Sequence, residues 1–222
     1  MKKFSIAIDG PAGAGKSSIA KEIAKKLGCI YIDTGAMYRT VGLGAILEGI
    51  DYHDEAAVSM LIPKLEIKLK ASEEGQQIYL NGQNVSTKIR NDEVAAAASR
   101  VATYVAVRQA LVASQRTMQN EDSVVMDGRD IGTVVMPNAT LKIYLTASVN
   151  ERALRRFKEY EAKGIVVDLE TLTAEIATRD KQDMERKISP LKKADDAIEI
   201  DTTYMTIEEI VTHIIALLQE RM

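Results

Sequence analysis

The part of this chain that most constrains its fold is residues 4–28, where an apolar run, a glycine-rich loop and a helical pattern follow one another. The run Phe4–Ile8 has the composition of a short buried strand. Residues 10–17 match the spacing G-x-x-x-x-G-K-S, and apolar residues then recur at helical spacing up to Gly28, a predicted C-cap. This order of strand, loop and helix is the setting that a phosphate-binding P-loop requires.

The chemistry of the loop follows from its backbone. Gly10, Gly13 and Gly15 can take positive φ and allow close approach to a ligand. The loop N–H groups and the positive end of the next helix would then face a polyphosphate. Lys16 would reach its β- and γ-phosphates, and the Ser17 hydroxyl would be the protein ligand of Mg²⁺. A glycine-rich turn followed by Lys-Ser by chance is the alternative, but it leaves the flanking strand and helix unexplained. The predicted phosphate site comprises Gly10, Pro11, Ala12, Gly13, Ala14, Gly15, Lys16, Ser17 and Ser18.

Composition limits what else the chain can be. With 222 residues, 46% of them hydrophobic, it is long enough for one core with an inserted subdomain. A net charge of −3 gives no electrostatic basis for general nucleic-acid binding. We expect no signal peptide and no membrane span. The single Cys29 fits a reducing cytoplasm, and nothing in the sequence requires more than a monomer.

Five short strand-like runs alternate with helical patterns, which predicts an α/β fold with a five-stranded parallel sheet and helices on both faces. The runs are Phe4–Ile8, Cys29–Ile32, Val124–Met126, Leu141–Leu145 and Ala197–Ile200. Ligands of such sheets bind beyond the carboxyl ends of the strands. Three of the runs are followed there by a carboxylate: Asp9, Asp33 and Asp127.

The middle of the chain has a different pattern. We predict a helix from Thr34, its expected N-cap, to about Glu48. Leu65–Leu69 then alternates apolar and polar residues, as a half-buried strand does. Asn81 and Gly82 separate two further strand-like runs and predict a hairpin with a type I′ turn. Small antiparallel strands inside a parallel α/β chain predict an inserted subdomain at about residues 55–95.

The third strand of the predicted sheet ends in Asp127-Gly-Arg-Asp130. An apolar strand ending in Asp is typical of the magnesium-binding segment of P-loop proteins, and Asp127 could hold a Mg²⁺-bound water. A turn stabilised by an Asp side chain is the alternative. The presence of Arg129 and Asp130 at the same strand end favours a site.

Two later helices carry unusual charge. Ser148 and Glu151 have the spacing of a capping box, and Arg152, Arg155 and Arg156 follow as either a solvated face or a phosphate clamp. Lys163-Gly164 would then allow a mobile flap. The next helix, about Leu169 to Lys187, has a stripe that starts apolar and turns charged: Leu169, Leu172, Ile176, Arg179, Asp183 and Arg186. Because burying these charges in a core is costly, this half of the helix either overhangs an anion or projects into water.

The chain is rich in positioned arginines and poor in candidate bases. A kinase that acts on a hydroxyl usually needs a carboxylate base, whereas a phosphate acceptor is already ionised and needs cations instead. A phosphate acceptor therefore fits best. The alternatives are a kinase of a small hydroxylated metabolite, such as shikimate, with Asp33 or Asp130 as the base, and a nucleotide-gated switch without turnover.

Four segments together resemble the bacterial cytidylate kinase family, and their order and spacing agree along nearly the whole chain. They are Ile8–Ser18, Asp33–Arg39, Asp127–Thr133 and Arg179-Asp-x-x-Asp183-x-x-Arg186. The resemblance implies transfer of a phosphoryl group from ATP to CMP or dCMP, with Mg²⁺. It also implies a core (1–33, 111–154 and 188–222), a nucleoside-monophosphate-binding region (34–110) and a short lid with its flanking helices (155–187).

The resemblance also assigns residues. The catalytic residues it implies are Lys16, Arg129, Arg179 and Arg186. The CMP phosphate contacts fall on Arg39, Arg129 and Arg186. The cytosine contacts fall on Ser99, Arg108 and Asp130, and the ribose contacts on Arg179 and Asp183. Thr34 stands where many members carry Ser, and Ser18 where others carry Thr; both keep a hydroxyl. Arg155 would be a lid contact to ATP.

The cytosine assignment has a physical rationale. Asp130 can accept a hydrogen bond from the N4 amino group of cytosine, and Ser99 and Arg108 can donate to N3 and O2. Uracil presents O4 and N3–H instead, so the same groups would face mismatched partners. A buried unpaired polar group costs about 1–3 kcal/mol, which corresponds to roughly tenfold to a hundredfold selection against UMP.

Overall fold

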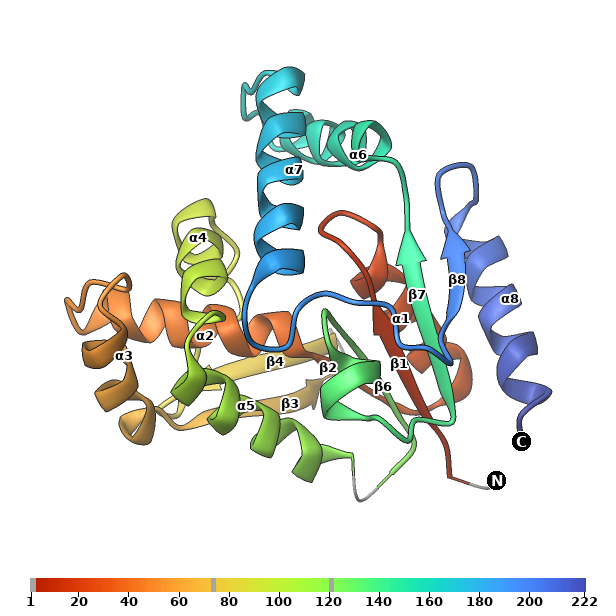
Figure 1. The fold of residues 1–222 in the computed structure, drawn as a ribbon, viewed down its shortest axis with the longest axis horizontal. Helices are drawn as coiled ribbons and strands as arrows, with labels where there is room; N and C mark the ends of the chain where they lie inside the picture. Colours follow the sequence, from red (N-terminus) through yellow and green to blue (C-terminus); the bar gives the residue numbers. More distant parts are fainter. Residues whose placement is uncertain (1–2, 73–74, 120–121) are drawn as a thin grey trace. The chain divides into compact units, whose positions relative to one another are not determined.

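The computed structural model describes residues 3–72, 75–119 and 122–222. The chain divides into two compact units, residues 1–29 with 123–222 (unit 1) and residues 30–122 (unit 2). The larger sheet has five strands in the order β2-β6-β1-β7-β8, and a second sheet has three in the order β3-β4-β5 (Figure 1). The predicted α/β class, with a parallel sheet and a small antiparallel sheet, is confirmed.

Unit 1 holds the P-loop and most of the parallel sheet. Its elements are β1 (Ser5–Asp9), α1 (Lys16–Leu27), β6 (Val124–Gly128), the π-helical turn η2 (Ile131–Val135), β7 (Leu141–Thr146), α6 (Val149–Ala162), α7 (Leu169–Glu185), β8 (Ile198–Asp201) and α8 (Ile207–Gln219). Strand β1 pairs in parallel with β6 and β7, and β7 with β8. The side chains of β1, β6 and β7 are mostly buried, as expected of parallel strands covered on both faces.

Local signals predicted several boundaries in unit 1 correctly. Gly28 ends α1 at φ 62°, the left-handed conformation typical of a glycine C-cap. Thr206 and Glu209 form a full capping box at the start of α8. At α6 only half of the predicted box is present: the Ser148 side chain accepts from Glu151 N–H, whereas the Glu151 carboxylate pairs with Arg155 one turn later. The i,i+4 ion pair therefore competes with the return bond to the cap.

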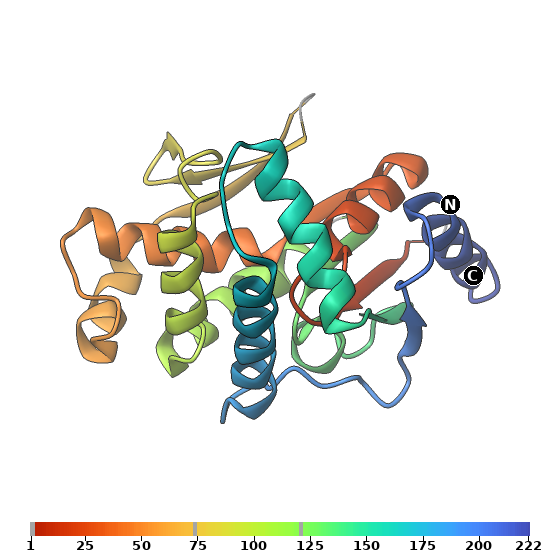
Figure 2. The ribbon, with the colours of Figure 1, turned by 90° about the horizontal axis from the view of Figure 1, so that it is seen from above.

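Helices α6 and α7 pack on each other through a small apolar cluster. Ala153, Leu172 and Ile176 are buried in it, with Phe157 and Tyr160 against them. In the two views the helix axes cross rather than run side by side (Figures 1 and 2). No described helix of the chain has the length and apolar character needed to cross a membrane.

Unit 2 contains the second sheet and a helical cluster. Its elements are β2 (Ile30–Asp33), α2 (Thr34–Leu47), α3 (Glu55–Leu61), the 3-10 turn η1 (Ile62–Lys64), β3 (Ile67–Ser72), β4 (Gly75–Leu80), β5 (Gln83–Asn84), α4 (Asp92–Val101) and α5 (Val105–Met118). Between β4 and β5, Asn81 and Gly82 have φ of 49° and 81°, as a type I′ turn requires. The predicted hairpin is confirmed, while β3 begins two residues later than the alternating pattern indicated.

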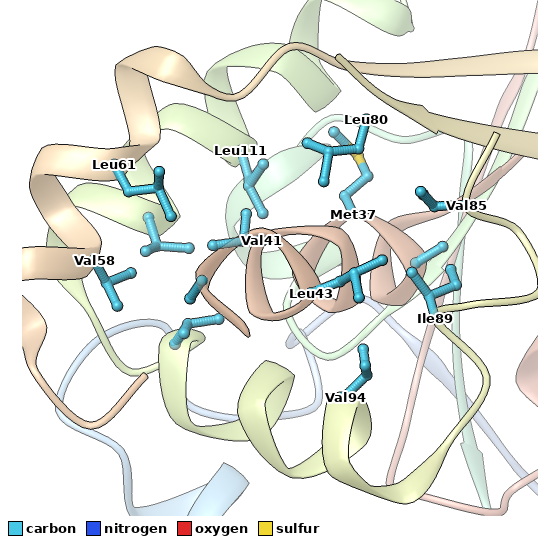
Figure 3. Close-up of a cluster of buried hydrophobic side chains, with 14 of the residues drawn as sticks. Met37, Val41, Leu43, Val58, Leu61, Leu80, Val85, Ile89, Val94 and Leu111 are labelled. Carbon is cyan, nitrogen blue, oxygen red and sulfur yellow. The ribbon is translucent and has the colours of Figure 1, made fainter. Parts of the chain in front are cut away.

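The core of unit 2 is built around α2. Met37, Val41 and Leu43 on this helix lie among apolar side chains from the neighbouring helices and from β4, which include Leu61 and Leu80 (Figure 3). Helix α2 is apolar around most of its circumference, so it has the composition of a central helix rather than a surface helix. This core fixes the helices that carry the unit 2 candidate residues.

The contact between α2 and α4 depends on glycine. A Cβ at Gly42 would lie 2.9 Å from Ala97 Cβ and 3.0 Å from Ala98 N. We therefore expect Gly42→Ala to lower the free energy of unfolding by about 1–3 kcal/mol through overpacking, although alanine is the better helix former by about 1 kcal/mol. The control is Gly44→Ala on the same helix, where the Cβ would meet only the flexible Leu65 side chain at 3.1 Å. Urea denaturation of both variants measures the difference, and equal stability would contradict the close packing.

Candidate active site

The P-loop connects β1 to α1 and is shaped by its glycines. Gly10, Gly13 and Gly15 have φ of 149°, 75° and 82°. At Gly10 a side chain is also excluded by space, because a Cβ would lie 2.0 Å from the carbonyl oxygen of Leu145 on β7. The loop therefore passes directly over the end of the neighbouring strand. This geometry gives a helix N-terminus preceded by a glycine-rich loop, the arrangement that binds phosphate groups.

Lys16 and Ser17 begin α1 and face groups on the loop and on β6. Lys16 is 6% exposed, and its Nζ donates to the carbonyl oxygen of Pro11 at 2.6 Å. Burial, reinforced by the positive charge of Arg129, lowers the pKa of Lys16 well below its usual value. The Ser17 hydroxyl donates to Asp127 Oδ2 at 2.8 Å. The hydroxyl and the carboxylate that the sequence suggested as magnesium groups therefore lie together.

Asp9 links the end of β1 to the segment after β6. Its two carboxylate oxygens accept from the N–H groups of Ile131 and Gly132, each at 2.7 Å. Burial raises the pKa of Asp9 to about 6, and the two backbone hydrogen bonds only partly oppose this. Asp9 thereby fixes the turn that carries Arg129 and Asp130. The sequence marked Asp9 as a strand-end carboxylate without predicting this contact.

The raised pKa of Asp9 predicts a pH dependence of stability. The native state binds the Asp9 proton more tightly than the unfolded chain does, so protonation at this site favours folding as the pH falls from above 6 to about 4. Relative to Asp9→Asn, the wild type should gain up to about 3 kcal/mol of unfolding free energy between pH 7 and pH 4. Urea titrations of both proteins at the two pH values measure this difference. If the difference in unfolding free energy between the two proteins is the same at both pH values, the pKa of Asp9 is not raised.

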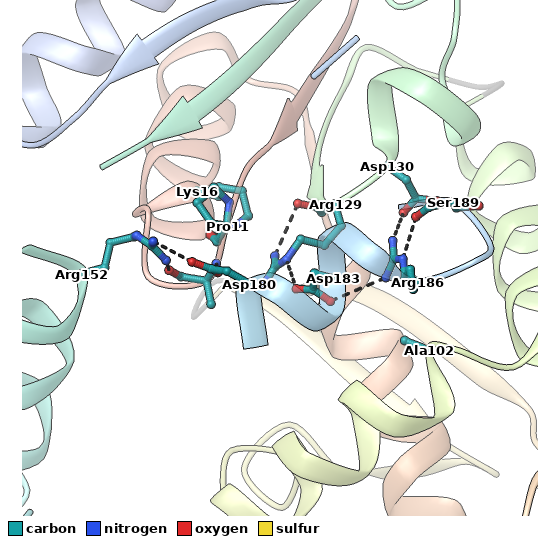
Figure 4. Close-up of polar contacts among 12 residues, drawn as sticks. Pro11, Lys16, Ala102, Arg129, Asp130, Arg152, Asp180, Asp183, Arg186 and Ser189 are labelled. Carbon is teal, nitrogen blue, oxygen red and sulfur yellow. Dashed lines mark hydrogen bonds and ion pairs between the residues drawn. The ribbon is translucent and has the colours of Figure 1, made fainter. Parts of the chain in front are cut away.

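Arg129 and the end of α7 form a mostly buried ion network. Arg129 Nε donates to Asp183 Oδ2 at 2.8 Å, and Arg186 Nη1 lies 3.8 Å from Asp183 Oδ1. Arg186 Nη2 is 3.6 Å from Asp130 Oδ1, and its Nε donates to the carbonyl oxygen of Ser189 at 2.6 Å (Figure 4). Burial alone would raise the pKa of Asp183. The charge and hydrogen bond of Arg129, together with the charges of Arg179 and Arg186, outweigh burial and lower that pKa.

The predicted stripe on α7 is only partly correct. The buried residues are Leu172, Ile176, Asp180 and Asp183, so the buried face continues through Asp180 rather than Arg179. Leu169 is 39% exposed. From Ile176, a step of four residues leads to Asp180 and a step of three leads to Arg179. The predicted stripe follows the step of three. Packing against α6 and the P-loop selects Asp180.

An ion pair beside the P-loop is not predicted by the sequence. Arg152 and Asp180 are both buried, and their nearest side-chain atoms lie 2.6 Å apart. The sequence groups Arg152 with Arg155 and Arg156 as a solvated face or a phosphate clamp, but of the three only Arg152 is buried. Arg155 instead donates to the carbonyl oxygen of Thr202 at 2.6 Å. The i+4 continuation from Leu172 and Ile176 was the sequence signal that could have identified Asp180.

Unit 2 carries the remaining candidates. Asp33, not Thr34, is the N-cap of α2, because its side chain accepts from the Ala36 N–H at 2.8 Å. The carboxylate of the preceding residue takes the capping role, and Thr34 becomes the buried first residue of the helix. Arg90 also pairs with Asp33, at 3.0 Å.

The other unit 2 candidates lie on α2, α4 and α5. Arg39 donates to the carbonyl oxygen of Ile89 at 3.2 Å. Ser99 is half-buried on α4. Arg108 on α5 is 3% exposed, donates to the carbonyl oxygen of Ala102 at 3.2 Å, and stacks 5.5 Å from the ring of Tyr38. Burying an arginine to this extent requires polar and aromatic partners, so its position is well defined.

In unit 1 the structure therefore brings together Lys16, Ser17, Asp127, Arg129, Asp130, Asp183 and Arg186. Their donors and acceptors suit anionic ligands, because cationic groups lie beside a loop of backbone N–H groups. No group of three or more His, Cys, Asp or Glu side chains able to hold a metal is found in the described part of the chain. Any metal here would have to complete its coordination with ligand or water oxygens.

Solved structures of other proteins have a fold similar to that of this chain. The shikimate kinase from Acinetobacter baumannii in complex with shikimate has a TM-score of 0.51 at 15% identity, covering 99% of this chain and 94% of that one. A gluconokinase from Sinorhizobium meliloti 1021 gives the same TM-score, identity and coverage. At this level of identity, these likenesses show the fold alone.

Comparison of sequences gives the family. The chain is 54% identical over 216 residues to the cytidylate kinase of Geobacillus sp. (strain WCH70), covering 97% of this chain and 96% of that protein. It is 49% identical over 220 residues to the cytidylate kinase of Bacillus subtilis (strain 168), covering 99% and 98%. The family model described as cytidylate kinase matches residues 6–220. The chain therefore belongs to the cytidylate kinase family.

Proposed function

We propose that this chain transfers the γ-phosphoryl group of ATP to CMP and dCMP, forming CDP and dCDP in pyrimidine nucleotide metabolism. The observation that carries the proposal is the match to the cytidylate kinase family along residues 6–220. The ion network of unit 1 supports it, because a phosphate acceptor needs cations rather than a base. A hydroxylated metabolite as acceptor is disfavoured by the same match.

The P-loop would bind ATP through its backbone N–H groups, from Gly10 to Ser18, with Lys16 reaching the β- and γ-phosphates. Arg155 on α6 would contribute a further contact to ATP. The pair formed by Ser17 and Asp127 fits Mg²⁺, since a hydroxyl and a carboxylate 2.8 Å apart are oxygen ligands of the kind that it prefers. When bound, Mg²⁺ would neutralise charge on the transferring phosphate oxygens.

The arginines would act on the phosphates. In unit 1, Arg129 and Arg186 would hold the CMP phosphate and stabilise the transferring group, with Lys16 and Arg179 as further catalytic residues. Asp183 holds Arg129 and lies beside Arg186, so it would orient both guanidinium groups. Arg39 would contribute a phosphate contact from unit 2.

The nucleoside would be recognised by hydrogen bonds to its base and its sugar. We assign cytosine contacts to Ser99, Arg108 and Asp130, ribose contacts to Arg179 and Asp183, and a further substrate contact to Thr34. These assignments follow the family resemblance. The burial of Arg108 and its hydrogen bond to Ala102 support them, since a donor held by such contacts discriminates well between bases.

We further propose a core formed by residues 1–33, 111–154 and 188–222, a monophosphate-binding region at 34–110 with its insert at about 55–95, and a lid at 155–187. We infer a monomer that acts in the cytoplasm on small-molecule substrates without nucleic-acid or membrane partners. The net charge of −3 and the single cysteine support this inference.

The test is ADP release in the presence of ATP, Mg²⁺ and, in separate reactions, CMP, dCMP, UMP, AMP, GMP and shikimate. We expect strong turnover with CMP and dCMP and little with UMP. Omission of Mg²⁺ should abolish turnover. Release of ADP only with shikimate, or with none of these acceptors, would refute the proposal.

A further inference from the structure

The P-loop is held at one residue, Ala12, by two side chains that have no role in the reaction as proposed so far. Arg152 Nη1 donates to the carbonyl oxygen of Ala12 at 2.8 Å, and Asp180 Oδ1 accepts from the Ala12 N–H at 3.3 Å. Arg152 Nη2 and Asp180 Oδ2 lie 2.6 Å apart (Figure 4). A single ion pair therefore satisfies both backbone polar groups of one loop residue.

This ion pair is buried and well anchored. Arg152 is 3% exposed and Asp180 is 7% exposed. The Nε of Arg152 also donates to the carbonyl oxygen of Ala147, just before α6, at 3.0 Å. A buried ion pair contributes little net stability, because desolvation of both charges offsets their attraction. Its contribution here is a defined geometry for the loop residue that it contacts.

The loop needs such a contact because its own sequence leaves it free to move. Gly10, Gly13 and Gly15 give the backbone many accessible conformations, which must be restricted before the N–H groups can converge on one ligand. Gly13 itself fits closely against Arg152, since a Cβ there would lie 3.1 Å from Arg152 Cβ. The loop is therefore packed against the start of α6 as well as hydrogen-bonded to it.

The contacts also set which way the Ala12 peptide groups point. A carbonyl oxygen directed at a polyphosphate would repel it. The hydrogen bond from Arg152 turns the Ala12 carbonyl oxygen toward the Arg152 side chain instead. Asp180 fixes the Ala12 N–H, and its negative charge is balanced by Arg152. The other loop N–H groups are then left to face the anion.

We propose that Arg152 and Asp180 are positioning residues that preset the P-loop for the ATP phosphates and tie it to α6 and α7. Arg155 lies on α6 and Arg179 lies on α7, so the two helices fix the position of the loop relative to these two arginines. The inference rests on the proposed use of ATP. It predicts that loss of the pair weakens ATP binding selectively.

The test is Asp180→Asn, which keeps the size of the side chain and an acceptor for the Ala12 N–H but removes the charge that faces Arg152. Calorimetric titration of the full chain with ATP and, separately, with CMP measures binding without turnover. We expect the Kd for ATP to rise about tenfold or more, because the buried Arg152 loses its carboxylate partner and no longer holds the loop in one geometry. The Kd for CMP should keep its wild-type value.

The matched control is Asp196→Asn, which likewise removes the carboxylate partner of a buried cation in unit 1. The Lys142 side chain is 7% exposed and lies 2.8 Å from Asp196, whose own side chain is 63% exposed. Among the described residues, neither of the two forms an ion pair with the P-loop. This variant should bind ATP as the wild type does. Equal weakening by both variants would indicate a general effect of removing the carboxylate partner of a buried cation and would overturn the proposal.

Unchanged ATP affinity in folded Asp180→Asn, or parallel loss of ATP and CMP affinity, would also overturn it. If thermal melting shows that Asp180→Asn does not fold, Arg152→Lys provides the second variant. It keeps the positive charge beside Asp180 but lacks the planar fork that also reaches Ala12 and Ala147, so ATP binding should again weaken. A wild type that binds ATP without phosphorylating CMP would refute the proposed function and leave this test intact.

Discussion

Lys16→Met is expected to lower kcat by about 10²–10³-fold, the effect typical of removing one preorganised group that stabilises transition-state charge. Lys16 lies buried at the start of α1, with Nζ 2.6 Å from the Pro11 carbonyl oxygen, so its charge sits within the P-loop. Methionine keeps the apolar stem and removes only the ammonium group. Steady-state measurement of kcat and KM for ATP and for CMP checks the prediction, and a variant with kcat close to wild type would exclude Lys16 from catalysis.

The same residue predicts an alkaline limit to activity. Burial, and then the charge of Arg129, lower the pKa of Lys16, so the charged form is lost at a lower pH than for an exposed lysine. The value of kcat/KM for ATP reports the free enzyme and should therefore fall as the pH rises through a value below 10.5. Lys16→Arg is the control, because an arginine remains charged throughout this range. If kcat/KM for ATP falls over the same alkaline range in both proteins, titration of Lys16 is not the cause.

Asp183→Ala should lower the free energy of unfolding by about 3 kcal/mol, because it leaves the mostly buried Arg129 without its carboxylate. The 2.8 Å contact between Arg129 Nε and Asp183 Oδ2 is the shortest ion pair that Asp183 makes among the described residues. The lowered pKa of Asp183 means that this stability is present above the carboxyl's unfolded pKa and is lost as the pH falls through the folded pKa. Urea denaturation at neutral and acidic pH measures both effects.

The double variant Arg129→Met with Asp183→Leu separates stability from chemistry. Two apolar side chains of similar size can replace a buried ion pair at little cost in stability, so most of the lost unfolding free energy should return. Activity should stay low, because the phosphate contact assigned to Arg129 is absent. Recovery of kcat/KM for CMP together with stability would show that the pair is structural and has no part in binding the substrate.

Elements set by local sequence were predicted well. The strand before the P-loop, the Gly28 C-cap, the Asn81-Gly82 turn and the Thr206 capping box each depend on residues within a few positions of one another. Backbone preferences and short-range hydrogen bonds decide such features, and the sequence shows both directly. The P-loop belongs to this group, since its glycine spacing and flanking elements are all local.

Competition between local alternatives was harder to predict. Asp33 rather than Thr34 caps α2, and Glu151 pairs with Arg155 instead of completing the box at Ser148. In each case two neighbouring groups could satisfy the same rule. The choice depends on the backbone conformation at each position and on the partners nearby.

The sequence by itself determined the class of fold, the phosphate-binding loop and the family, because these rest on motifs and on strand order. Only the tertiary structure decided which charged residues support the loop. Asp180 reaches Ala12 across 168 positions of the chain, and Asp9 reaches Ile131 across 122. A helix such as α7 presents several possible faces at spacings of three and four, and the partner against which it packs selects one of them. Contacts of this kind arise when distant segments fold together, so no local pattern encodes them.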